Sequence, residues 1–375
     1  MDTLVSALKS SARHLVAPIL HVGWYSRLRH RLEVTSNRQP LKPGVTAIVA
    51  ARDEAYLIPF CLESLVGAVD QIVCVDNGSG DGTLALMHEF RTRRAADLDV
   101  EVLSLPGALL GECRQAALQL TRHEWHLRWD ADMVCRTTGS ETFSGLCRRV
   151  LTDDRPRAIQ LPRTNLVGDL HHTHRLFPVI DPGEPILMRF SQLIKYREIG
   201  RFDVIRVPLS YRQVVDKGHY YVHCAGLKSD ENLIHRFHYF AWREAVNAAP
   251  DARTRHALAD FGVFKRQRNL ELFGTTAPSS LKFRYQRQLV YHLQRYDETA
   301  YGPYPEVLRS ELERPDPRFE VVYRDGRPYL RLDRADRDML DYRPTADDLA
   351  WDPEAFLRRF LTPAQCLQLR ITSSA

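Results

Sequence analysis

The stretch that sets the fold runs from Val45 to Thr83 and reads VTAIVAARDEAYLIPFCLESLVGAVDQIVCVDNGSGDGT. It holds two short apolar runs, at 45–51 and 71–75, with apolar residues at helical spacing over 54–68 between them. Uninterrupted apolar runs of this length are typical of strands that are buried on both faces of a parallel sheet. The stretch therefore predicts a strand, a helix and a second strand.

The same alternation continues along the chain. It predicts a helix over 83–94, a strand over 100–105, a helix over 111–122 and a strand over 126–129. Strands that alternate with helices in this way predict an α/β fold, a Rossmann-like and mostly parallel sheet with helices on both faces. In such sheets ligands lie beyond the carboxyl ends of the strands. This rule selects three segments for a binding site: 51–54, 76–82 and 130–132.

Two aspartates, Asp130 and Asp132, follow the fourth predicted strand. Residues two apart on an extended chain leave the same face, so both carboxylates would point the same way. Such a pair offers the hard oxygen ligands that a divalent cation prefers. The alternative interpretation is an exposed turn that happens to contain two aspartates.

The segment after the second strand, 76–83, is rich in glycine and aspartate. Glycine permits the positive φ of tight turns, and Ser79 or Asp81 can cap the next helix. Its spacing differs from the dinucleotide fingerprint, and the chain has no P-loop motif. The alternative interpretation of 76–83 is a simple strand-to-helix turn. For 50–54 the alternative is an exposed loop, and for Arg114 it is a solvated helix face.

These segments, in their order, resemble family 2 glycosyltransferases of the GT-A fold. The resemblance rests on VTAIVAARDE, QIVCVDNGSGDGT, CRQAAL and WHLRWDAD, and it covers about residues 44–135. Gln115 stands where the family usually has asparagine, and Ala50 and Ala51 stand where proline is frequent. Neither departure touches the aspartate pair.

The resemblance implies an enzyme of the hexosyltransferase type, with a nucleotide-sugar donor and a Mn²⁺ or Mg²⁺ ion. Asp130 would face the ribose or the metal, and Asp132 would bind the metal. The residues that the resemblance places around the nucleotide sugar are Ala51, Arg52, Glu54, Asp76, Arg114 and Asp130.

The second half resembles the family only faintly. By the family's pattern, His223 would be a third metal ligand, with His235 and His238 as substitutes, and Lys228 would contact the diphosphate. Asp230 and Glu231 lie where the family often has an acidic pair, which makes them candidates for the base of an inverting transfer. Alternatively, Ser-Asp-Glu is the capped start of a helix, and His223 is structural.

The whole basic excess lies at the start of the chain. The formal net charge is +5, and residues 1–42 hold seven basic and two acidic residues, so 43–375 are balanced. A neutral main body argues against nucleic acid as a partner. Apolar residues at helical spacing, with Trp24 and Tyr25 beside arginines, suggest membrane contact through 1–36. The alternative is a helix packed on the domain.

The chain lacks an apolar run long enough to span a membrane, a convincing signal peptide and a paired cysteine pattern. We therefore expect a cytoplasmic protein, with peripheral contact at the inner face of the membrane. The acceptor would be a carbohydrate or a lipid-linked molecule, in polysaccharide or glycoconjugate biosynthesis.

Three regions are expected: the basic segment 1–42, a glycosyltransferase domain 43–250, and an α-rich extension 251–375. The domain would divide into a nucleotide half, 43–135, and an acceptor half, 136–250. In the extension, the pattern predicts helices over 281–296, 334–342 and 356–368 and a hairpin over 319–332. Two other functions stay open: a nucleotidyltransferase of related fold, and a non-catalytic carbohydrate-binding or scaffold protein.

Overall fold

The computed structural model describes residue 28 and residues 40–371, apart from 140, 200–201, 259, 314–318, 325–326 and 334–341. The described residues form two compact units. The first comprises the described parts of Met1–Arg163, Asp181–Val222 and Pro303–Val307, and the second comprises those of Thr164–Ile180, His223–Gly302 and Leu308–Ala375. The predicted domain boundaries after residues 42 and 250 stay predictions. The predicted N-terminal segment and the helix over 334–342 fall mainly outside the described residues.

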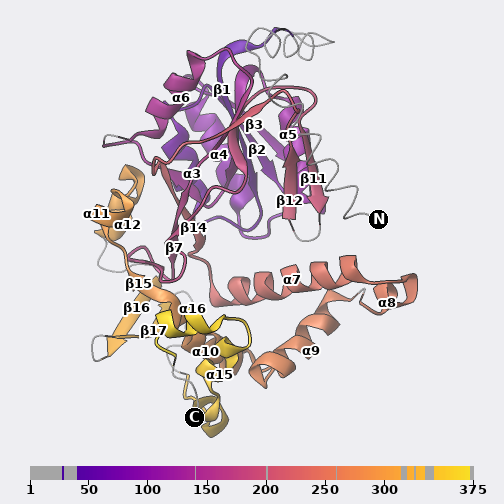
Figure 1. The fold of residues 1–375 in the computed structure, drawn as a ribbon, viewed down its shortest axis with the longest axis vertical. Helices are drawn as coiled ribbons and strands as arrows, with labels where there is room; N and C mark the ends of the chain where they lie inside the picture. The colour runs from indigo at the N-terminus through magenta and orange to yellow at the C-terminus, as the bar shows by residue number, and fades with distance from the viewer. Residues whose placement is uncertain are drawn as a thin grey trace. The chain divides into compact units, whose positions relative to one another are not determined.

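A seven-stranded sheet forms the centre of the first unit (Figure 1). Only β10 runs antiparallel to the other six strands. In spatial order the strands are β13 (Arg212–Val215), β6 (Arg157–Gln160), β10 (Pro185–Arg189), β4 (His123–Asp130), β1 (Lys42–Ala51), β2 (Gln71–Asp76) and β3 (Asp99–Ser104).

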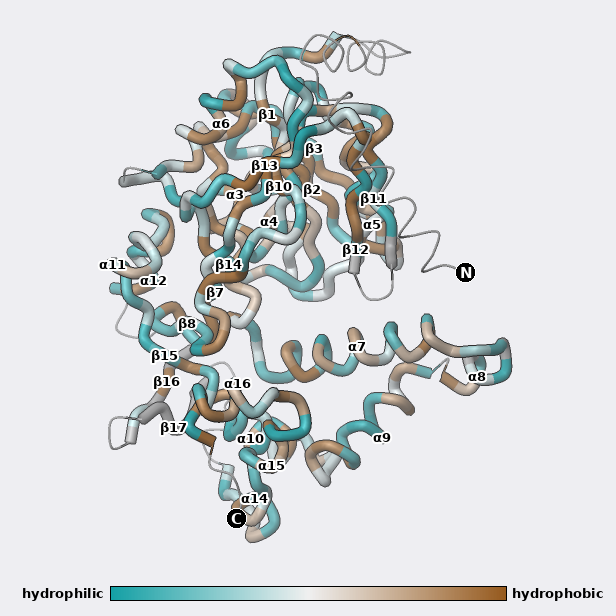
Figure 2. Tube along the Cα trace, in the orientation of Figure 1, coloured by the Kyte–Doolittle hydropathy of each residue, from teal (hydrophilic) through white to brown (hydrophobic). Residues whose placement is uncertain are grey.

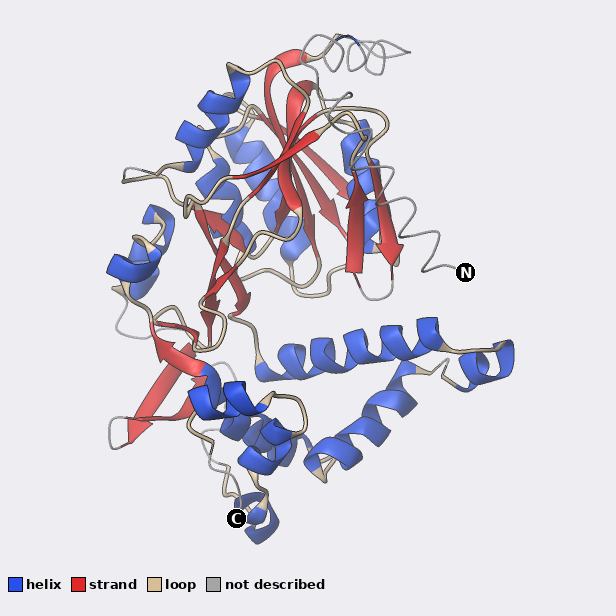
Figure 3. Cartoon of the chain, in the orientation of Figure 1, coloured by secondary structure: helices blue, strands red, loops and turns tan. Residues whose placement is uncertain are grey.

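Helices cover both faces of this sheet, as Figure 3 shows. Side chains alternate along a strand, so Val45, Ala47 and Val49 of β1 join one apolar cluster while Ile48 joins another. The first cluster includes α3 (Ile58–Leu65), α4 (Thr83–Arg94) and α6 (Phe143–Leu151), and the second includes α5 (Leu110–Gln119). The predicted α/β class, with a mostly parallel sheet between helices, is confirmed.

A hairpin of β11 (Lys195–Ile199) and β12 (Phe202–Arg206) lies beside α5 in the first unit (Figure 1). The short strand β5 (Met133–Cys135) follows the aspartate pair. Gly111 of α5 fits closely against the hairpin, because a Cβ there would lie 3.2 Å from the backbone of Arg197. The hairpin therefore packs directly on the helix.

The second unit is rich in helices. Its longest helix is α7, along which hydrophilic and hydrophobic residues alternate (Figure 2). The helices are α7 (Asp230–Ala248), α8 (Ala252–Ala257), α9 (Phe261–Phe273), α10 (Pro278–Leu289), α11 (Glu298–Tyr301), α12 (Arg309–Leu312), α14 (Ala346–Ala350), α15 (Pro353–Arg358) and α16 (Pro363–Gln368).

Short strands complete this unit. Strand β14 carries the chain out of the first unit at residues 222–223. The strands are β7 (Arg163–Val167), β8 (His172–His174), β9 (Val179–Ile180), β14 (Tyr221–Gly226), β15 (Leu293–Arg295), β16 (Phe319–Arg324) and β17 (Arg327–Asp333). The predicted C-terminal extension of helices with some strand structure is present.

Two helices predicted in the extension differ from those observed. The helix predicted over 281–296 ends at Leu289, because Leu293 is fully buried in β15, which pairs with β8. The helix predicted over 356–368 is broken into α15 and α16, since Pro363 starts a new helix capped by Thr362. The predicted hairpin is present, as β16 pairs with β17. No helix of the described residues is long and apolar enough to cross a membrane.

Candidate functional site

The ends of three parallel strands bring the predicted site segments together in the first unit. In the register of the sheet, Ala51 of β1 lies opposite Asp76 of β2, and Ala50 lies opposite Asp130 of β4. Because the strands are parallel, the segments that follow them lie at one carboxyl edge. This is the edge at which ligands bind in open α/β sheets.

Hydrogen bonds join the loop after β1 to the turn after β2. The backbone N–H of Asp53 donates to Ser79 Oγ at 2.9 Å, and the N–H of Gly80 donates to Asp53 Oδ1 at 2.8 Å. Asp53 adopts a φ of +54°, in the left-handed region that non-glycine residues rarely occupy. The N–H of Glu54 donates to Thr83 Oγ1 at 2.8 Å. The two segments thus hold each other in one conformation.

Asp81 adds a further link between the same two segments. Its carboxylate accepts hydrogen bonds from the N–H of Ala55 at 2.9 Å and from the N–H of Thr83 at 3.1 Å. Partial burial alone would raise the pKa of Asp81, but the hydrogen bonds from Thr83 and Ala55 favour the ionised form and lower it. The link is therefore made by the carboxylate.

The predicted nucleotide-binding residues of this loop and turn differ in exposure. Asp76 is almost fully buried, and its carboxylate accepts the N–H of Gly78 at 3.0 Å and of Ser79 at 3.3 Å. It therefore shapes the turn that follows β2. Ala51 is buried, Arg52 is exposed, and Glu54 is half-buried.

Arg114 is fully buried within α5. Its guanidinium donates to Asp130 Oδ1, and to the carbonyl of Trp129 at 3.3 Å. It also forms an ion pair with Asp203, with 2.7 Å between Nε and Oδ2. Burial alone would lower the pKa of Arg114, but Asp130 and Asp203 together outweigh it and raise the pKa. Arg114 thus stays charged and orients Asp130, while its contact with a nucleotide stays a prediction.

The sequence did not identify three charged residues of this network, Arg128, Asp203 and Glu184. Arg128 lies two residues before Asp130 on β4 and pairs with Asp203 at 3.1 Å and with Glu184. The sequence held a signal for Arg128: it lies two residues from Asp130 on a strand, so both side chains point to the same face of the sheet. Asp203 had no signal, because it lies 75 residues from Arg128 in the chain.

Asp130 and Asp132, at the carboxyl end of β4, are suited to a metal ion. His223 belongs to the second unit, and its role as a third ligand stays a prediction. Two carboxylates suit Mg²⁺ or Mn²⁺, and an imidazole can join them around a transition metal. The residues present therefore fit the ion that the sequence predicts.

Lys228, Asp230 and Glu231 belong to the second unit. Ser229 caps α7 by accepting the N–H of Asn232 at 3.2 Å, so Asp230 and Glu231 lie in its first turn. Lys228 and Asp230 are buried, and Asp230 accepts a hydrogen bond from Gln286, whereas Glu231 is exposed. The segment is the capped start of a helix, as the alternative interpretation predicts. The roles of Asp230 and Glu231 as base and of Lys228 as diphosphate ligand stay predictions.

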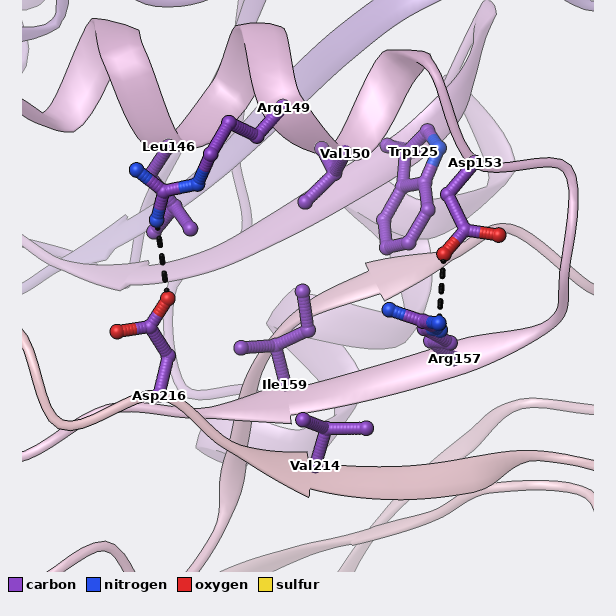
Figure 4. Close-up of a pocket in the computed structure, with 9 residues that line it drawn as sticks. All are labelled: Trp125, Leu146, Arg149, Val150, Asp153, Arg157, Ile159, Val214 and Asp216. Atoms are coloured by element: carbon purple, nitrogen blue, oxygen red, sulfur yellow. Dashed lines mark hydrogen bonds and ion pairs between the residues drawn. The ribbon is translucent and has the colours of Figure 1, made fainter.

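A small pocket of about 240 Å³ lies elsewhere in the first unit, between α6 and strands β4, β6 and β13 (Figure 4). Its apolar floor includes Trp125 and Ile159. Two ion pairs flank it, Arg149 with Asp216 at 3.0 Å and Arg157 with Asp153 at 2.9 Å. None of the predicted site residues lines this pocket.

Solved structures match this chain with low sequence identity and a low TM-score. TarS of S. aureus (residues 1–349), in complex with UDP-GlcNAc, is 16% identical over 76% of this chain and 98% of its own, with a TM-score of 0.35. The mannosyltransferase PcManGT from Pyrobaculum calidifontis, in complex with GDP-Man and Mn²⁺, is 16% identical over 70% of this chain and 81% of its own, with a TM-score of 0.37. Among curated proteins, none matches the chain.

The family comparison is more specific. Residues 46–140 match the family described as "Glycosyl transferase family 2". The matched segment contains most of β1, strands β2 to β5, the loop after β1, the turn after β2, Arg114 and both aspartates. Over residues 46–140, this chain is therefore similar to glycosyl transferase family 2, the family whose motifs its sequence resembles.

Proposed function

We propose that this protein is a metal-dependent glycosyltransferase that moves a sugar from a nucleotide-sugar donor to an acceptor hydroxyl. The observation that carries the proposal is the meeting of Asp76, Asp130 and Asp132 at one carboxyl edge of the sheet, within the segment that matches the family. Open α/β sheets bind their ligands at this edge. The donor would therefore bind here.

The donor would lie along the joined loop and turn. The nucleoside would contact the segment of Ala51, Arg52 and Glu54 together with Asp76, and Lys228 would pair with the diphosphate. The hydrogen bonds of Asp53, Ser79 and Gly80 support this, since a surface that is ordered before binding loses less conformational entropy when the ligand binds.

Asp130, Asp132 and His223 would hold a Mn²⁺ or Mg²⁺ ion. When bound, such an ion neutralises the negative charge that develops on the diphosphate leaving group. The contribution of the chain is to orient the ligands. Arg114 holds one oxygen of Asp130, and Trp129 Nε1 donates to the carbonyl of Met133 at 3.0 Å across the turn that carries Asp132.

An inverting transfer requires a carboxylate that accepts the proton of the acceptor hydroxyl. Asp230 and Glu231 are our candidates. Glu231 is exposed, whereas Asp230 is 2% exposed and accepts a hydrogen bond from Gln286. Glu231 is therefore the carboxylate that an acceptor from solvent can reach, and we assign it the role of base.

The acceptor would be a carbohydrate or a lipid-linked molecule, in the synthesis of a polysaccharide or glycoconjugate. The basic and aromatic residues of 1–36 would hold the protein peripherally at the cytoplasmic face of an anionic membrane. Both statements rest on the sequence alone.

A donor screen tests the proposed activity. The purified chain is incubated with a panel of UDP-, GDP- and other nucleotide sugars in the presence of Mn²⁺, and release of the nucleoside diphosphate is measured. We expect turnover of a donor that is abolished by EDTA and restored by Mn²⁺. Turnover that is unaffected by EDTA would contradict the metal dependence.

Calorimetry with UDP or GDP and Mn²⁺ tests the metal ligands. Asp132→Asn and His223→Gln should each weaken Mn²⁺-dependent nucleotide binding. Asp153→Asn is the matched control, because Asp153 precedes β6 at the amino ends of the strands and pairs with Arg157 (Figure 4). Unchanged affinity in Asp132→Asn would reject the metal assignment.

A further inference from the structure

Asp203 is a buried carboxylate that lies between two arginines in the first unit. Its side chain is 8% exposed. Oδ2 lies 2.7 Å from Arg114 Nε, and Oδ1 accepts a hydrogen bond from Arg128 Nη2 at 3.1 Å. Arg114 is fully buried, and the side chain of Arg128 is 13% exposed. Asp203 and both arginines are therefore largely shielded from water.

The charges around Asp203 form one network. The two guanidiniums face three carboxylates: Asp203, Asp130 and the more exposed Glu184. A buried cation is stable only when it is paired and hydrogen-bonded. Arg114 is neutralised from two sides, by Asp130 at the carboxyl edge and by Asp203 from the hairpin. The position of its guanidinium is set by both.

The hairpin that carries Asp203 is anchored independently of Asp130. The N–H of Tyr196 donates to Gln115 Oε1 of α5 at 3.0 Å, and the hydroxyl of Tyr196 lies 3.3 Å from His126 Nε2 of β4. The backbone of Arg197 lies close to Gly111, so the hairpin also packs directly on α5. Asp203 is thus presented to Arg114 from a fixed element.

We propose that Asp203 is a positioning residue for metal binding: it holds Arg114 and Arg128 in place and thereby keeps Asp130 oriented toward the cation. The inference rests on the proposed function. With Asp203 present, Arg114 divides its attraction between two carboxylates. Without it, the full charge of Arg114 acts on Asp130 and competes with the cation for the same carboxylate.

The test measures Mn²⁺ binding rather than turnover. Mn²⁺ is titrated into the purified full-length chain with saturating UDP or GDP, and free Mn²⁺ is measured by electron paramagnetic resonance. Loss of groups that orient metal ligands typically lowers metal affinity by about 10- to 100-fold, and we expect a decrease of this size for Asp203→Asn. Asp153→Asn, the same substitution in an ion pair at the other edge of the sheet, should keep the affinity of the wild type.

A second variant tests the proposal if Asp203→Asn does not fold. Arg128→Met combined with Asp203→Asn removes one cation with one anion, so the buried net charge does not change. Replacing a buried pair is often neutral for stability, whereas removing one partner is not. The double variant should fold and still bind Mn²⁺ more weakly than the wild type, because Arg114 then pairs with Asp130 alone.

The outcomes separate this inference from the proposed function. If a folded Asp203 variant binds Mn²⁺ as tightly as the wild type while Asp132→Asn does not bind it, the role of Asp203 is rejected and the metal site stands. If the wild type itself binds no Mn²⁺ in the presence of either nucleotide, the proposed metal site is rejected, and the role of Asp203 with it.

Discussion

The fully buried guanidinium of Arg114 donates a hydrogen bond to the carboxylate of Asp130, so the carboxyl edge of the sheet is tied to the interior of the first unit. This pair gives Arg114 a structural role before any ligand binds. Removing one partner of a buried ion pair leaves the other charge without compensation.

We therefore predict that Arg114→Gln lowers the free energy of unfolding by about 3–5 kcal/mol. Urea denaturation followed by circular dichroism measures it. Arg155→Gln is the control: its side chain is 50% exposed and pairs with Asp153, so the loss should stay below about 1 kcal/mol. Equal losses in the two variants would show that the Arg114 pair contributes no more than a surface pair.

Asp81 predicts a pH dependence. Its folded pKa lies below the ordinary value of 3.8, so its contribution is fully present above pH 3.8 and is lost as pH falls through the lowered pKa. Asp81→Ala removes the hydrogen bonds to Ala55 and Thr83 and should lower the free energy of unfolding by about 1 kcal/mol at pH 7.

The difference in unfolding free energy between the wild type and Asp81→Ala should then shrink as pH falls below 3.8. Urea titrations at a series of pH values measure this difference. A difference that stays constant down to the lowest pH at which the chain folds would contradict the ionised link between the loop and the turn.

The sequence predicted those parts of the fold that depend on local pattern. Strands β1 and β2 follow from short apolar runs, because a strand buried on both faces must be apolar throughout. Strands β3 and β4 and helix α4 follow from shorter apolar runs and helical spacing. The antiparallel strand β10 was not predicted. It inserts between β4 and β6 from a later part of the chain, and no local pattern states with which strand a segment pairs.

The same distinction holds for the candidate site. Asp76, Asp130 and Asp132 were found because each follows a strand, and strand ends meet at one edge. Asp203 was not found, because its partners Arg114 and Arg128 lie far away in the sequence and its hairpin has no motif. Residues that orient a site from another element become visible only when the fold brings them together.

The proposed membrane role of residues 1–36 predicts that membrane binding can be lost without loss of nucleotide binding. Deleting 1–36 should abolish binding to vesicles that contain anionic lipid, because basic residues near such a surface each contribute about 1 kcal/mol. Co-sedimentation with anionic and neutral vesicles measures the binding, and calorimetry with UDP or GDP and Mn²⁺ verifies that nucleotide binding survives. Vesicle binding that persists after the deletion would reject this role.

The assignment of Glu231 as base gives a prediction about turnover. Once a donor and an acceptor are known, Glu231→Gln should lower kcat by about 100- to 10,000-fold, the usual contribution of general base catalysis. The KM for the donor should change little, because Glu231 is not expected to contact the nucleotide. Glu244→Gln, an exposed glutamate on the same helix, is the matched control.

Asp230→Asn should retain most of the turnover, since Asp230 is buried and accepts a hydrogen bond from Gln286. If Asp230→Asn lowers kcat and Glu231→Gln does not, the base is Asp230, and if both variants keep full turnover, the first turn of α7 supplies no base.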